Sequence, residues 1–182
     1  IIYHWTRHIK EGLQYLHKAV QCAVESGNIL IAGYSYCVIL ENKYIMGTVL
    51  DEVLEEAKKC KSYARKMKHE NLAINTVVYE RVASALAGRT GSISLVGVDD
   101  FDEDGFVKSM KGDKASIAAY YFSKMQFCYM FGQYRDAVSA AEEINRCKGA
   151  IMGFMISAEC NFYHSLSIAA AYSELTSKEK KK

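Results

Sequence analysis

The acidic segment 100–105 has the spacing best suited to chemistry. It reads Asp-Phe-Asp-Glu-Asp-Gly and matches the opening of an EF-hand loop, in which alternate carboxylates and a glycine wrap a calcium ion. The twelfth position counted from Asp100 is Lys111, where calcium needs a bidentate carboxylate. We therefore predict that Asp100 to Asp104 form an acidic surface loop ahead of a short helix, with a calcium loop as the alternative.

Two histidines, His4 and His8, stand one helical turn apart and could face one zinc ion. Trp5 occupies the place of the glutamate in the H-E-x-x-H zinc motif, and no third ligand follows nearby. We predict that both histidines lie on a helix surface. No Ser, Cys or Asp stands at a spacing from a base that supports nucleophilic catalysis, and neither the P-loop motif G-x-x-x-x-G-K-[ST] nor the protein kinase motifs occur in the sequence. The sequence therefore predicts no catalytic residue, no metal site and no cofactor.

The six cysteines stand singly, on apolar faces, with no C-x-x-C pair among them. They are Cys22, Cys37, Cys60, Cys128, Cys147 and Cys160. This pattern favours buried, reduced thiols in a cytoplasmic protein over a disulfide framework.

Tyrosine is abundant, with 13 residues in the chain. At helical spacing most of these rings belong in a core, but an aromatic ring with a polar tip also suits a binding groove. If a groove exists, we expect it to be lined by Tyr34, Tyr36, Tyr120 and Tyr121.

The composition indicates an ordinary globular chain that favours helices. Hydrophobic residues make up 50%, charged residues 24%, and proline is absent from all 182 positions. The net charge of +2 gives no electrostatic argument for nucleic acid, and no apolar run is long enough to cross a membrane. We predict one helical-repeat domain over 1–176 and a charged tail over 177–182. Because the chain starts at Ile1, we expect it to be a fragment of a longer protein.

Hydrophobic periodicity predicts about seven main helices. Their expected ranges are 7–26, 29–45, 50–67, 71–88, 114–131, 134–146 and 151–172. Thr6, Asn71 and Asp113 are placed to cap three of them. We also expect two ion pairs four residues apart on outer faces, Glu55 with Lys59 and Glu142 with Arg146.

A helix-turn-helix motif occurs twice. Tyr44-Ile-Met-Gly47, with Asp51 and Val53 after it, returns 85 positions later (129 − 44) as Tyr129-Met-Phe-Gly132, with Asp136 and Val138. In each copy a helix apolar on nearly all sides meets a glycine, and an amphipathic helix follows. Alternating inner and outer helices predict an all-α fold, an irregular α-α superhelix of the tetratricopeptide-like solenoid type.

The segment Gly132-Gln-Tyr134-Arg-Asp-Ala137 resembles the turn and second helix of a tetratricopeptide repeat. The first copy departs from that pattern, because Val49 replaces the tyrosine and Glu52 the alanine.

A longer resemblance runs from about Tyr3 to Tyr172. It is carried by His4-Trp5, Leu13 to Ala19, Glu25-Ser-Gly-Asn28, Ala32-Gly-Tyr34, Gly47 with Leu50-Asp-Glu-Val53, Asp100-Phe-Asp-Glu103 and Tyr129-Met-Phe-Gly-Gln-Tyr134. Together these segments resemble the helical region of large bacterial-type signalling proteins. Those proteins combine a serine/threonine kinase-like domain, a P-loop predicted ATPase, tetratricopeptide-like helices, often a GAF domain, and a sensor histidine kinase or cyclase.

The resemblance implies a non-catalytic scaffold that couples the nucleotide-binding domain to the output domain and contacts protein partners. An independent tetratricopeptide-type adaptor for a peptide or protein is the alternative. The family's relatives carry Asp where this chain has Asn28, a small departure without functional weight.

Overall fold

The computed structural model describes residues 3–89 and 102–172, which form helices joined by short turns. This part of the chain contains eight α-helices, two short 3-10 helices and no β-strand. The α-helices are α1 (Ile9–Glu25), α2 (Ile29–Ile45), α3 (Leu50–Met67), α4 (Glu70–Leu86), α5 (Glu103–Ser109), α6 (Lys114–Met130), α7 (Tyr134–Cys147) and α8 (Met155–Ala171). The 3-10 helices are η1 (Tyr3–Trp5) and η2 (Lys148–Ala150). The predicted all-α class is confirmed. The short helix α5 starts inside the acidic segment, at Glu103, rather than after it.

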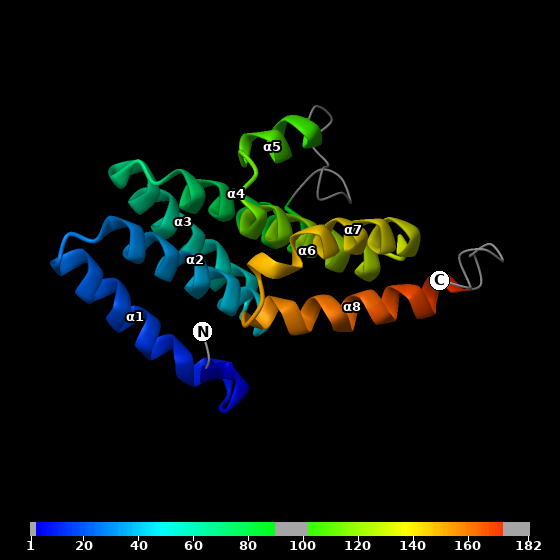
Figure 1. The fold of residues 1–182 in the computed structure, drawn as a ribbon, viewed down its shortest axis with the longest axis horizontal. Coiled ribbons are helices and arrows are strands. Elements are labelled where there is room, and N and C mark those ends of the chain that lie inside the picture. Colours follow the sequence, from blue (N-terminus) through cyan, green and yellow to red (C-terminus); the bar gives the residue numbers. More distant parts are fainter. Residues whose placement is uncertain (1–2, 90–101, 173–182) are drawn as a thin grey trace.

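The helices pack as hairpins. α1 packs on α2, α3 on α4 and α6 on α7, while α8 covers α7 and α6 and also contacts α2. Figure 1 shows α1 to α4 in one half of the molecule and α6 to α8 in the other, with α5 projecting beyond α4 and α6. A hydrogen bond from the Trp5 indole Nε1 to the Gly153 carbonyl, 3.1 Å long, ties the start of the chain to the turn before α8.

The inner row consists of α2, α4 and α6, because α4 contacts both of the others. The prediction that α2 and α6 are inner helices is confirmed. Thr76, Val78, Tyr79 and Val82 of α4 are all buried. This broad burial arises because α4 is paired with α3 and is also enclosed between α2 and α6.

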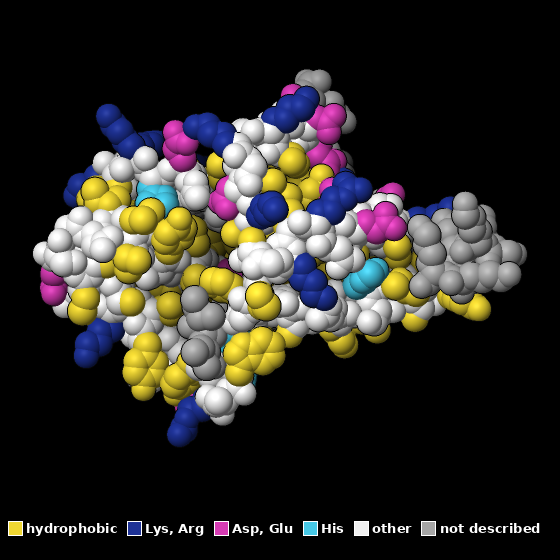
Figure 2. Space-filling view, in the orientation of Figure 1, with side chains coloured by type: hydrophobic (Ala, Val, Ile, Leu, Met, Phe, Trp, Pro, Cys, Tyr) yellow, Lys and Arg dark blue, Asp and Glu magenta, His cyan; other side chains and the backbone are white. Residues whose placement is uncertain are grey.

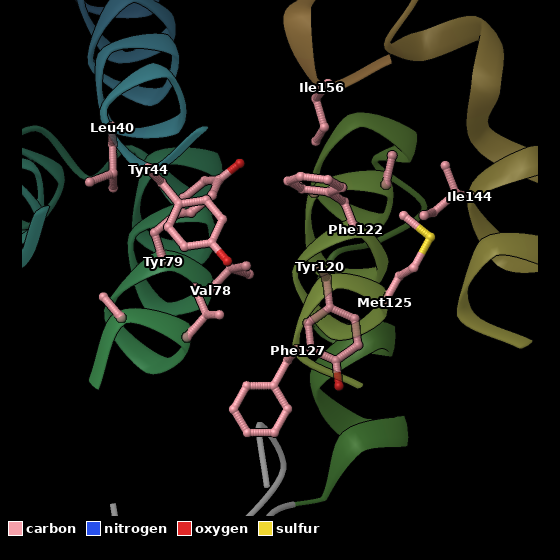
Figure 3. Packing of buried hydrophobic residues seen from close by; sticks show 14 of the residues in the cluster. Leu40, Tyr44, Val78, Tyr79, Tyr120, Phe122, Met125, Phe127, Ile144 and Ile156 are labelled. Carbon is pink, nitrogen blue, oxygen red and sulfur yellow. The ribbon is translucent and has the colours of Figure 1, made fainter. Parts of the chain in front are cut away.

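Buried apolar side chains form one continuous cluster that extends from α2 to α8. In Figure 3, Tyr44 from α2 lies against Tyr79 from α4, and Phe122 from α6 faces Ile156 from α8. Full burial of a large apolar side chain stabilises a fold by roughly 1.5–3 kcal/mol, so this cluster holds the hairpins together. The cluster crosses from one hairpin to the next and joins α2, α3, α4, α6, α7 and α8 into one packed body.

The helix caps follow geometry more than residue type. Asp113 caps α6, as predicted, by accepting a hydrogen bond from the Ala115 amide at 3.2 Å. Thr6 and Asn71 do not cap their helices, and the caps of α1 and α4 are His8 and His69. Each histidine uses Nδ1 as the acceptor, a role that a neutral imidazole can fill.

The outer ion pairs form one residue away from the expected partners. Lys58 pairs with Glu55 at 2.5 Å, and Arg146 pairs with Glu143, so both pairs are three residues apart. Lys59 instead lies 3.6 Å from Glu56, a buried carboxylate. Spacings of three and four residues are nearly equivalent on a helix surface. For Lys59, the buried carboxylate of Glu56 decides in favour of the three-residue spacing.

None of the described helices is long and apolar enough to cross a lipid bilayer. Residues 177–182, predicted as a charged tail, lie outside the described residues, so that part of the domain prediction stays a prediction.

Candidate functional site

The first two tyrosines of the predicted groove lie on α2 and point to different neighbours. Tyr34 is exposed, and its ring meets the His69 ring edge-on, with centroids 6.0 Å apart. Tyr36 is half-buried and packs on the Tyr63 ring of α3, with centroids 4.9 Å apart. Tyr34 therefore belongs to the surface, whereas Tyr36 belongs to the contact between α2 and α3.

The other two tyrosines lie on α6. Tyr120 is buried and Tyr121 half-buried, with ring centroids 5.2 Å apart, and Phe106 of α5 packs on Tyr120. Burial raises the pKa of the Tyr120 hydroxyl above its usual value. Among the described residues, no ring contact joins this pair to Tyr34 or Tyr36. The four tyrosines thus occupy three separate places rather than one groove.

A pocket of about 580 Å³ lies beside Tyr121, where α5, α6 and α7 meet. Four carboxylates line it: Glu103, Asp104, Asp136 and Glu143. Lys124 neutralises part of this charge through an ion pair with Glu103, at 2.6 Å. The pocket remains acidic, so its field favours cationic groups.

A second candidate lies at the end of the molecule where α1 turns into α2 and α3 turns into α4. We call it the hairpin-end surface, and define it by Val24, Ile29, Leu30, Ile31, Tyr34, Lys68 and His69. In Figure 2 hydrophobic side chains gather over this end of the molecule, with Lys and Arg side chains at the edge. A hollow of about 340 Å³ separates the first turn of α2 from the α3–α4 turn.

His69 holds the two halves of the hairpin-end surface together. Its Nδ1 accepts a hydrogen bond from the Leu72 amide at 3.2 Å, which caps α4. Its ring lies directly against Gly33 of α2, because a Cβ added there would fall 2.1 Å from Nε2. The glycine therefore allows α2 and α4 to approach closely. The sequence did not single out His69, although a histidine directly before a run of helical residues is the available signal.

A buried polar centre joins the inner helices. The Tyr79 hydroxyl donates to Glu41 Oε2 at 3.2 Å, and the Tyr44 hydroxyl donates to Gln126 Oε1. The two tyrosine rings pack together, with centroids 5.4 Å apart. Glu41 and Gln126 occupy equivalent places in the two motif copies, since 126 − 41 is also 85. That equivalence is the sequence signal that could have identified both residues as buried.

Glu41 is the most perturbed acid of this centre. Burial raises the pKa of its carboxyl to about 7, and the hydrogen bond from Tyr79 opposes the shift. The residue as a whole is half-buried, but its Oε1 is shielded from solvent and has no hydrogen-bond partner in the described structure. A carboxyl in this environment favours the neutral, protonated form.

The cysteines form no disulfide among the described residues. Four are buried and Cys37 is half-buried, which agrees with the prediction, but Cys22 is exposed and contradicts it. Burial raises the pKa of Cys60 and of Cys160 to about 12. Because the thiolate is the reactive form, these two thiols are unreactive near neutral pH.

The described part of the acidic segment builds a helix. Asp102 caps α5 by accepting from the Gly105 amide at 2.8 Å, and Glu103 pairs with Lys124. Lys111 pairs with Glu70 at 2.7 Å. Asp100 lies outside the described residues. Within the described ranges, no three His, Cys, Asp or Glu side chains are grouped to hold a metal ion.

The two metal-candidate histidines are separated in function. His4 lies in η1, half-buried next to the Trp5 ring, and burial lowers its pKa. His8 caps α1. The prediction that both histidines lie on a helix surface is therefore wrong, because His4 is half-buried in a 3-10 helix and His8 directly precedes α1.

Comparisons of the chain with protein-family models, with curated proteins and with solved structures found no match. The tetratricopeptide-like signalling family therefore stays a prediction based on the motifs of the sequence.

Proposed function

We propose that this chain is a helical-repeat interaction module without catalytic activity of its own. The observation that supports the proposal most directly is the hairpin-end surface, where five large apolar side chains are exposed together at the ends of packed hairpins. Exposed apolar clusters of this kind occur at surfaces that bind other proteins. The partner is a protein, with no role for nucleic acid or a membrane.

The chain acts as a scaffold within a multidomain signal-transduction kinase/ATPase in the cytoplasm and couples its nucleotide-binding domain to its output domain. The collinear motifs from Tyr3 to Tyr172 support this assignment, and the stacked hairpins suit it. Packed helical repeats transmit contacts along their axis and leave their surfaces free for partners. The absence of P-loop and kinase motifs in the sequence supports a scaffold over an enzyme.

The assignment is tested by reading the coding sequence on both sides of this segment. We expect a P-loop domain upstream and a histidine kinase or cyclase domain downstream. A short reading frame without those domains would favour the alternative, an independent tetratricopeptide-type adaptor. ATP turnover by the isolated chain would contradict both assignments.

A further inference from the structure

We propose that the hairpin-end surface binds a protein segment that carries apolar side chains together with carboxylates. The inference rests on the proposed function, because it names the site and the chemistry through which the module would bind a partner.

The apolar part of the surface is large and contiguous along the chain. Ile29 is 44% exposed, Leu30 55%, Ile31 47% and Tyr34 47%, and all four belong to the first turns of α2. Val24, near the end of α1, is 48% exposed beside them. Side chains of this size cost free energy when they remain in water, so a partner that covers them gains affinity.

The surface is hollowed rather than flat. The hollow of about 340 Å³ lies between Ile29 and Leu30 on one side and Met67 and Lys68 on the other. A second hollow, of about 320 Å³, lies on α3 and α4 and shares Lys68, His69 and Glu70 with the first. Both are in the size range that accommodates side chains of a bound segment. A planar lipid surface would leave them unfilled.

The charge of the surface favours carboxylates. Arg65 and Lys68 line the hollows, and no acidic side chain among the described residues lies within ion-pair distance of either. Glu70 is neutralised by Lys111, at 2.7 Å. The positive ends of the α2 and α4 dipoles are offset here by the negative ends of α1 and α3, which reach the same turns, so the excess positive charge comes from the side chains of Arg65 and Lys68. A segment with both apolar and acidic side chains complements these features.

The test is a titration of the isolated chain with fluorescently labelled peptides of about 14 residues that alternate Leu or Phe with Glu. A second peptide carries Lys in place of every Glu. We expect the acidic peptide to bind at least about tenfold more tightly than the basic one, and its affinity to fall with added salt. The amide signals of Ile31, Tyr34 and Lys68 should shift in NMR spectra during the titration.

The site is tested with the double variant Arg65→Glu/Lys68→Asn, in which Asn tolerates the left-handed backbone at position 68 (φ 53°). The matched control, Lys10→Glu/Lys18→Gln, makes the same charge change on exposed positions of α1. We expect the first variant to weaken binding by about tenfold or more and the control to leave it unchanged. Thermal unfolding followed by circular dichroism confirms that both variants fold.

The outcomes separate this inference from the proposed function. Acidic peptide binding that survives Arg65→Glu/Lys68→Asn would overturn the site and leave the interaction module standing. Equal binding of acidic and basic peptides, or of neither, would overturn the inference, while the flanking coding sequence would still decide the proposed function. Tighter binding to phosphatidylserine vesicles than to the acidic peptide would overturn it in favour of a membrane contact.

Discussion

The turn at Gly47 and the turn at Gly132 are built alike but are used differently. Both glycines have positive φ, 66° and 76°. The backbone amide of Thr48 donates a hydrogen bond to the Lys43 carbonyl at 3.2 Å. The amide of its counterpart, Gln133, donates to the Cys128 carbonyl at 2.8 Å. Yet α6 and α7 form the most extensively packed pair of the fold, whereas α2 packs on α1 more than on α3. The second turn closes a hairpin, and the first joins two hairpins.

The residues after each turn explain the difference. In the second copy Tyr134 packs on Tyr129, with ring centroids 5.8 Å apart, and Ala137 is fully buried. In the first copy Val49 is 64% exposed and Glu52 is exposed at the position of the alanine. A small residue and an aromatic ring let two helices approach, while a charged residue keeps its helix open to water. The turn alone therefore does not decide which helices pair.

The contact between α2 and α3 also differs from the contact between α6 and α7 by an ion pair. Lys43 and the buried Glu56 form an ion pair of 2.6 Å, where the second copy has Cys128 and Ala141. Both second-copy residues are buried and apolar. The joint between hairpins therefore adds an ion pair to its apolar contacts, whereas the hairpin of α6 and α7 has apolar side chains at the matching positions.

The largest expected effect on stability comes from placing the glutamate of the first copy, Glu52, at the matching position of the second copy, Ala137. Ala137→Glu places a carboxylate in a fully buried position between α6 and α7. We expect it to lower the free energy of unfolding by about 4 kcal/mol, because the charge has no partner there. Urea denaturation measures the change. The reciprocal variant Glu52→Ala should change the free energy of unfolding by less than about 0.5 kcal/mol. Equal effects at the two sites would contradict the conclusion that the residues after the two turns pack differently.

The ion pair of the joint gives the next effect. Lys43→Ala leaves Glu56 buried with only Lys59 nearby, at 3.6 Å. We expect a loss of about 3 kcal/mol in urea denaturation, because a buried carboxylate that keeps only a longer ion pair with an exposed lysine is poorly compensated. The double variant Lys43→Cys/Glu56→Ala reproduces the second copy and should recover most of that loss. If the double variant is as unstable as the single one, the two copies are not interchangeable at this contact.

Glu41→Gln replaces the buried acid with the residue of the second copy. Because the folded-state pKa of Glu41 is raised to about 7, the folded state holds a proton that the unfolded state releases. The free energy of unfolding of the native chain has its full value below the ordinary pKa of a glutamate and falls as the pH rises through 7. At pH 8 we expect the variant to exceed the native chain by up to about 3 kcal/mol, and at pH 5 the two should be close. Denaturation curves from pH 5 to 8 that run parallel would contradict the raised pKa.

Gly33→Ala has the smallest effect of the four. The second copy already has alanine at the matching position, Ala118, but Gly33 faces the ring of His69. The added methyl must displace the ring or separate α2 from α4, which we expect to cost about 2 kcal/mol. Loss of the α4 cap would appear as faster amide exchange at Leu72. If Gly33→Ala leaves the free energy of unfolding unchanged, the close approach of the two helices is not needed.

The ends of α1, α2, α4 and α6 could be predicted from the sequence, because a glycine follows each of them closely. Gly47 and Gly132 mark such ends, and the departures at Val49 and Glu52 were visible as well. The effect of these departures on helix pairing could not be predicted, because the pairing depends on contacts between segments far apart in the chain. The central place of α4 and the contact of the His69 ring with Gly33 both arise from such contacts.

The candidate site was predicted only in part. Tyr34 lies on the exposed surface, but Tyr36 and Tyr120 are packed against other rings, and periodicity alone does not distinguish these cases. The buried state of Glu41 depends on α4 and α8, which approach it only in the folded chain. A charge in a helix that is otherwise apolar is the kind of exception that sequence analysis should examine first.

Hydrogen–deuterium exchange of this chain, with and without the acidic peptide, tests the central claim most directly. An interaction module with a charged joint at Gly47 should change its protection at the first turns of α2 and α4 and around that joint. The hairpin of α6 and α7 should remain unchanged, because apolar packing holds it closed. Changes confined to α6 and α7, or no change anywhere in residues 3–89 and 102–172, would contradict the account.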